Sequence, residues 1–184
     1  MDSPTSFQFP PVYDFPPFFT RQPTLSTWQD QAKQWQTLVL NYCRHQRQFR
    51  LTLSEAANSE LFNNTAIGRK LPLAAIHEVI QLMVDQGRAE WLDDKKTSRN
   101  QCLIYWHSPE EWADLIYQWI QDRALNNSVL TLYELTHDDL SQGAEFHGMD
   151  ALMLRRVLST LVSKGKAQVF HNDEAANEAG VKFF

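Results

Sequence analysis

Apolar residues recur at helical spacing in four stretches of the chain. Each stretch places its apolar side chains on one face, which is the pattern of a helix packed against a core. The four faces are formed by Trp28, Ala32, Trp35, Leu38, Val39 and Tyr42, by Leu73, Ile76, Val79, Ile80, Met83 and Val84, by Trp112, Leu115, Ile116, Trp119 and Ile120, and by Leu154, Val157, Leu158, Leu161 and Val162. The sequence therefore predicts four main helices, beginning near residues 25, 72, 109 and 151.

Short extended stretches lie between and after these helices. Gly87 and Gly165 follow a helical face and come directly before such a stretch, which is the place of a helix-ending glycine. Ser108 and Pro109 read as an N-cap and a first helical position, and Glu111 completes a capping box. Strands are predicted at 51–53, 88–92, 101–106, 130–132, 166–171 and 180–184, a short helix at 133–136, and polar loops at 93–100 and 172–179.

The chain repeats itself once. Residues 51–55 (LTLSE) recur as 130–134 (LTLYE), residues 84–90 recur as 162–168, and residues 103–106 correspond to 181–184. The offsets are 79 and 78 residues and the order is the same, so the sequence predicts a duplicated domain of roughly 80 residues.

Within each copy the order of elements is a helix, a short strand, further helices and then a two-stranded hairpin. This is the order of a winged-helix domain, in which the last helix leads into the hairpin. The predicted fold is α+β, with two tandem winged-helix domains at 24–106 and 107–184. An extended segment rich in proline and aromatic residues precedes them at 1–23.

The N-terminal segment has its own pattern. It contains six prolines in 23 residues, which disfavours a helix or a central strand and favours polyproline II. Two Pro-Pro-x-aromatic units stand six residues apart, and their aromatic side chains are expected to enter apolar pockets of a partner protein. The residues assigned to docking are Pro10, Pro11, Tyr13, Pro16, Pro17, Phe18 and Phe19. Three alternatives remain: the segment is a disordered leader, it folds back on its own domain, or residues 10–13 act as a PPxY ligand for a WW domain.

Charge separates the two copies. Residues 24–106 hold 10 Lys and Arg against 8 Asp and Glu, whereas residues 107–184 hold 6 against 12. An acidic second half repels a phosphate backbone and attracts a basic partner. A winged-helix DNA-binding regulator is the alternative that the fold alone suggests. It is disfavoured because the helix before the first wing has no Lys or Arg.

Signals of catalysis, metal binding and membrane insertion are missing from the sequence. The six histidines and two cysteines show no zinc spacing, and no nucleophile or phosphate-loop motif occurs. We therefore expect no enzymatic activity, no metal and no cofactor. Cys43 and Cys102 fit buried thiols in a reducing compartment. No apolar run spans a bilayer, and the N-terminus lacks the features of a secretory signal.

The chain resembles the vacuolar protein sorting-associated protein 25 family, the small tandem winged-helix subunits of the ESCRT-II complex. The resemblance covers essentially the whole length. It rests on an ordered set of motifs: residues 10–13 (PPVY) with 15–19 (FPPFF), 61–64 (LFNN), 109–112 (PEEW) with 115–119 (LIYQW), 127–135, 145–148 (EFHG) and 180–184 (GVKFF).

This resemblance implies a non-enzymatic adaptor. In the family, two copies per complex dock on two larger ESCRT-II subunits through the Pro-Pro-x-aromatic units. The second winged helix recruits an ESCRT-III subunit through that partner's N-terminal helix, for sorting of ubiquitinated cargo into multivesicular bodies. Location in the cytoplasm with indirect recruitment to endosomal membranes is implied as well. For the ESCRT-III contact the candidates here are Tyr133, Glu134, Phe146 and His147. Deleting residues 1–19 is expected to abolish assembly and leave both domains folded.

Overall fold

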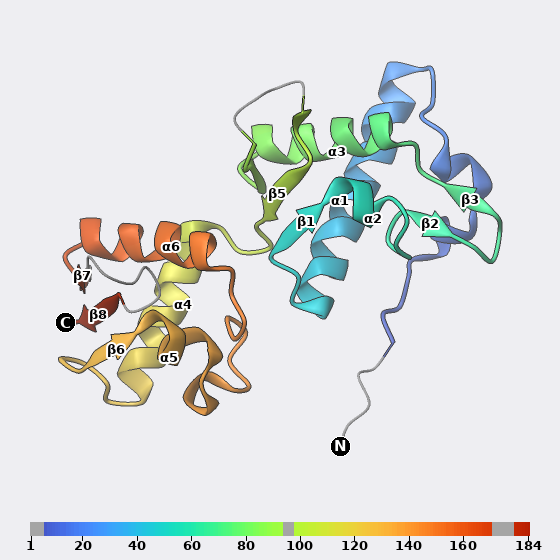
Figure 1. Ribbon diagram of the computed structural model, residues 1–184. Coiled ribbons are helices and arrows are strands. Elements are labelled where there is room, and N and C mark those ends of the chain that lie inside the picture. Colours follow the sequence, from blue (N-terminus) through green and yellow to red (C-terminus); the bar gives the residue numbers. More distant parts are fainter. Residues whose placement is uncertain (1–5, 94–97, 171–178) are drawn as a thin grey trace. The chain divides into compact units, whose positions relative to one another are not determined.

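The computed structural model describes residues 6–93, 98–170 and 179–184, and these form two compact units that meet in sequence between Trp106 and His107. Each unit combines helices with a three-stranded antiparallel sheet (Figure 1). Residues 94–97 of the predicted loop at 93–100 and residues 172–178 of the predicted loop at 172–179 lie outside the described residues.

The first unit is built on a long helix, α1 (Leu25–Gln46), and on α3 (Leu73–Asp85). Its sheet has the order β1-β5-β4, with β1 at Arg50–Thr52, β4 at Ala89–Trp91 and β5 at Gln101–Ile104. Leu51 and Trp91 both pair with Cys102 of the central strand. Gly87 follows α3 with a φ of 71°, in the left-handed region that favours glycine, so the chain turns directly into β4 as predicted.

Two features of the first unit carried no clear sequence signal. One is the short helix α2 (Leu53–Ala56), and the other is the small hairpin of β2 (Asn63–Asn64) and β3 (Arg69–Lys70). Both lie between β1 and α3, in a stretch without apolar periodicity. The hairpin matters for function because the N-terminal segment lies against it (Figure 1).

The second unit repeats the plan. It contains α4 (Pro109–Asp122), β6 (Val129–Thr131), α5 (Leu132–His137) and α6 (Ala151–Ser163), then β7 (Ala167–Phe170) and β8 (Gly180–Phe183) in a β6-β8-β7 sheet. Ser108 and Glu111 form the predicted capping box. Leu130 pairs with Val181 and Leu51 pairs with Cys102, so Val181 takes the place of Cys102 in the second sheet. The sequence repeat had aligned Val181 with Leu103, so this part of the predicted correspondence is wrong by one residue.

The N-terminal segment differs from the extended polyproline II conformation that its composition favours. It forms two one-turn 3-10 helices, η1 (Pro11–Asp14) and η2 (Pro16–Phe19), each beginning with proline. The fixed φ of proline suits the first position of a helical turn as well as an extended chain. Contacts with the first domain therefore determine that the segment forms 3-10 turns and not an extended polyproline II chain.

Candidate functional site

The aromatic side chains of the N-terminal segment point into the first domain. Tyr13, Phe18 and Phe19 are only 6%, 3% and 2% exposed. The ring of Phe18 stacks on that of Trp35 in α1, with centroids 4.1 Å apart and planes 5° apart. Phe19 meets the same indole edge-on at 5.3 Å. Of the alternatives that the sequence left open, the structure shows the N-terminal segment folded back on its own first domain.

Hydrogen bonds hold the backbone of the segment at the same places. The carbonyl oxygen of Phe18 accepts from Trp35 Nε1 at 3.0 Å and from Gln31 Nε2 at 2.6 Å. The carbonyl oxygen of Tyr13 accepts from Asn64 Nδ2 at 2.8 Å. Asn64 lies in β2, within the LFNN motif, so this motif positions the first Pro-Pro-x-aromatic unit.

The hydroxyl groups of two tyrosines meet at Glu60. Tyr13 donates to the backbone oxygen of Glu60, and Tyr42 donates to its carboxylate at 3.0 Å. Burial, followed by the nearby Glu60 carboxylate, raises the pKa of Tyr13 to about 12. Burial and the hydrogen bond to Glu60 raise the pKa of Tyr42 to about 12 as well. Both phenols therefore remain neutral donors at physiological pH.

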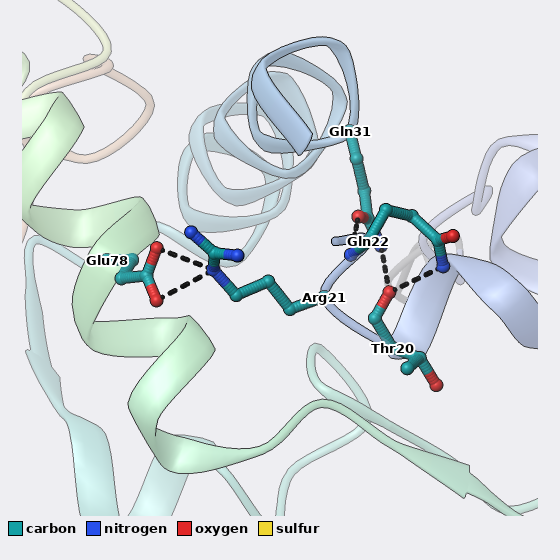
Figure 2. A network of polar contacts seen from close by, with 5 residues as sticks. All are labelled: Thr20, Arg21, Gln22, Gln31 and Glu78. Atoms are coloured by element: carbon teal, nitrogen blue, oxygen red, sulfur yellow. Dashed lines mark hydrogen bonds and ion pairs between the residues drawn. The ribbon is translucent and has the colours of Figure 1, made fainter. Parts of the chain in front are cut away.

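The end of the segment is fixed by a polar network, drawn in Figure 2. Arg21 Nε lies 2.9 Å from both carboxylate oxygens of Glu78 in α3, and its guanidinium stands over the ring of Trp28 at 5.0 Å. The side chains of Gln22 and Gln31 both donate to the carbonyl oxygen of Thr20, at 2.9 and 3.0 Å. The segment is thus anchored to α1, α3 and the β2–β3 hairpin.

The outward face of the segment consists of prolines and one aromatic ring. Pro11, Pro16 and Pro17 are exposed, and Phe15 is 58% exposed. The sequence assigned docking to the aromatic residues of both units but passed over Phe15, because Phe15 precedes a Pro-Pro pair instead of following one. In this conformation Phe15 and the prolines can reach a partner, whereas Tyr13, Phe18 and Phe19 cannot.

This arrangement bears on two sequence-based expectations. A PPxY ligand must present its tyrosine, and the side chain of Tyr13 is buried against its own domain. Removing residues 1–19 takes Phe18 and Phe19 away from Trp35, so the structure gives a physical reason to expect a destabilised first domain after that deletion.

In the second domain, α5 and the start of α6 form a groove of about 230 Å³. Tyr133 is 62% exposed and its ring stacks on that of His137 with centroids 5.3 Å apart. Leu132, Met149 and Leu154 contribute apolar surface to the groove, and Arg155 contributes a guanidinium. Of the four candidates for the ESCRT-III contact, Tyr133 is the one that lines this groove.

The other three candidates have local partners. Glu134 forms a capping box with Thr131, accepting from its backbone N–H at 2.7 Å. Phe146 has no exposed surface and packs edge-on against Trp119 at 5.2 Å, so it belongs to the core and cannot contact a partner in this fold. His147 Nδ1 lies 2.9 Å from the hydroxyl of the buried Ser141.

A cluster of metal ligands and a membrane-spanning helix are both missing from the part of the chain that the structure describes. Within it, no three His, Cys, Asp or Glu side chains gather for a metal ion, and no helix is long and apolar enough to cross a membrane. Burial raises the pKa of the Cys102 thiol to about 12 and that of Cys43 further, so both are unreactive thiols.

Comparison with known proteins identifies relatives along the whole chain. Residues 12–150 match the family described as ESCRT-II complex subunit. Vacuolar protein-sorting-associated protein 25 is 46% identical in Danio rerio, over 97% of this chain and 99% of that protein, and 45% identical in Homo sapiens, over 97% and 98%.

Two solved structures are similar to the full fold. The crystal structure of subunit VPS25 of the endosomal trafficking complex ESCRT-II has a TM-score of 0.85 at 30% identity, covering 95% of this chain and 98% of that one. The chain in the crystal structure of the endosomal complex ESCRT-II (VPS22/VPS25/VPS36) has a TM-score of 0.82 at the same identity and coverage.

Proposed function

The chain belongs to the vacuolar protein sorting-associated protein 25 family, the non-enzymatic VPS25 subunits of the endosomal trafficking complex ESCRT-II, and from this membership we propose that it is a two-ended adaptor. Its first domain docks on the two larger ESCRT-II subunits, the counterparts of VPS22 and VPS36. Two copies of this chain per complex are part of the proposal, as the family resemblance implies. Its second domain recruits an ESCRT-III subunit for sorting of ubiquitinated cargo into multivesicular bodies. The chain acts in the cytoplasm and reaches endosomal membranes through the complex.

The observation that carries the docking proposal is the division of the N-terminal segment into an inward and an outward face. Stacking on Trp35 and the hydrogen bonds to Phe18 and Tyr13 fix the segment before any partner binds. A preformed apolar ridge loses little conformational entropy on association. Phe15, Pro11, Pro16 and Pro17 form this ridge, and Phe15 is its largest apolar side chain.

For the second domain, the proposal rests on charge and on the groove beside α5. Residues 107–184 carry 6 Lys and Arg against 12 Asp and Glu, which favours a partner of positive charge. The groove offers apolar walls and the exposed ring of Tyr133. The occupant is an amphipathic helix of an ESCRT-III subunit, which lays its apolar face into the groove and whose polar face is basic.

Reconstitution with purified partners tests both ends separately. Phe15→Asp is expected to abolish co-purification with the two larger subunits, because it places a charge in the apolar centre of the contact. Tyr133→Asp is expected to leave that assembly intact and to weaken binding of the ESCRT-III subunit at least tenfold. Undiminished assembly of Phe15→Asp refutes the docking proposal, and undiminished ESCRT-III binding by Tyr133→Asp refutes the second.

A further inference from the structure

Helix α1 presents an unusual solvent-facing stripe next to the N-terminal segment. Thr27, Asp30, Gln34, Thr37 and Asn41 follow one another along this exposed side of the helix. Solvated helix faces usually carry many Lys and Glu side chains, whereas this stripe has a single charge, and Asp30 has Lys33 at 3.8 Å. Because charged side chains are few on this stripe, removing water from it on binding costs little free energy.

Two shallow apolar grooves run between this stripe and the segment. The first has a volume of about 380 Å³ and lies between α1 and the residues around η1; the second has about 450 Å³ and reaches to Phe15 and Pro17. Val12 and Gln34 line both grooves, one from each wall. The two grooves therefore form one continuous surface, and both the segment and α1 contribute to its lining.

We propose that α1 forms, together with the ridge of the segment, one composite docking surface for a larger ESCRT-II subunit, and that Gln34 stands at its centre. This inference rests on the proposed function and adds α1, which neither the sequence motifs nor the family resemblance assigns to docking. The partner presents apolar side chains that enter the two grooves on either side of Val12. Its polar groups meet the amides and hydroxyls of the α1 stripe.

The chemistry of the surface selects this occupant over others. A patch with an apolar centre and a polar rim is typical of protein–protein contacts, and the charged residues that line these two grooves are Asp30 and Lys33. Nucleic acid and anionic lipid require clustered Lys and Arg, and among the described residues Lys33 is the one cation lining either groove. The surface is also continuous with Phe15, the exposed ring of the segment, so a subunit that covers the ridge covers the neighbouring turns of α1.

Two glutamines of α1 provide a matched test. Gln34 and Gln29 are both exposed and lie in the same helix, but Gln29 lines neither groove. Five residues of helix turn its side chain away by roughly 140°. In Gln34→Arg the longer side chain fills the junction of the grooves, and in Gln29→Arg the same change of size and charge lies outside the surface. The full-length variants are compared by circular dichroism, and their dissociation constants are measured against the co-expressed pair of larger subunits.

We expect Gln34→Arg to weaken binding at least tenfold and Gln29→Arg to change it less than twofold, with unchanged melting temperatures. Equal dissociation constants of the two variants, whether both weakened or both unaffected, overturn the composite surface. Phe15→Asp separates the two proposals. If it abolishes assembly while Gln34→Arg binds like the wild type, docking through the segment stands and the role of α1 fails. If Phe15→Asp and Gln34→Arg both assemble normally, the proposed docking through the segment and the role of α1 are both refuted.

Discussion

The stacking of Phe18 on Trp35 predicts how much the N-terminal segment depends on its buried aromatic residues. Phe18→Ala removes a side chain that is 3% exposed, together with a ring stacked at 4.1 Å. Truncation of a buried phenylalanine costs about 3–5 kcal/mol, and we expect the lower end because the site lies at the edge of the domain and can partly collapse. Phe15→Ala is the matched control in the same segment. Its ring is 58% exposed, so its truncation should cost no more than about 0.5 kcal/mol.

Hydrogen exchange followed by mass spectrometry measures this cost where it arises. Within the segment, the backbone N–H groups of Tyr13, Phe15, Phe18 and Thr20 donate to carbonyl oxygens three residues earlier, at 2.9–3.1 Å. A loss of about 3 kcal/mol accelerates exchange of these amides roughly 100-fold, since each 1.4 kcal/mol is a factor of ten. The urea midpoint of the first domain should fall in parallel.

A particular outcome would refute the reasoning. If Phe18→Ala accelerates exchange in residues 11–20 no more than Phe15→Ala does, the segment is not held by its buried rings. The contacts with Trp35 would then be incidental to docking on the domain.

Three further predictions concern the neutral tyrosines, the thiols and the helix caps. Because burial raises the pKa of Tyr13 to about 12, its contribution to stability is fully present below pH 10 and is lost as the pH rises to 12, when the unfolded chain releases the proton first. Urea unfolding at pH 9 and pH 11 should therefore show a smaller loss for Tyr13→Phe than for the wild type, and equal losses would contradict this. Cys43 and Cys102 should react with iodoacetamide at pH 8 within minutes in urea but not in the native protein, and rapid native labelling would show that the burial is wrong. Ser108→Ala should destabilise the second domain by about 1 kcal/mol in thermal unfolding. Ser159→Ala, at an exposed position inside α6 of the same domain, removes no cap and should change its stability by no more than about 0.5 kcal/mol. Equal losses for the two variants would contradict the role of the cap.

The elements predicted best from the sequence are those with long apolar periodicity or explicit caps. The four main helices and the capping box of Ser108 and Glu111 lie where the pattern placed them. Three short elements, α2, β2 and β3, escaped prediction. The strands β2 and β3 have two residues each, too few for any period, and the two strands pair with each other beside the N-terminal segment. The burial of Phe146 was also not decided by the sequence. Its motif suggested a partner contact, whereas its ring packs on Trp119.

The sequence by itself determined the duplication, the winged-helix order and the contrast between a near-neutral first copy and an acidic second copy. These follow from periodicity, spacing and charge, which are local or additive properties of a chain. Only the tertiary structure decided which face of the N-terminal segment is free. Pro-Pro-x-aromatic units fit an external pocket and an internal one equally well, because both offer apolar surface to a ring. Trp35, Gln31 and Asn64 settle the choice, since their rings and amides match Phe18 and Tyr13 only when the chain has folded.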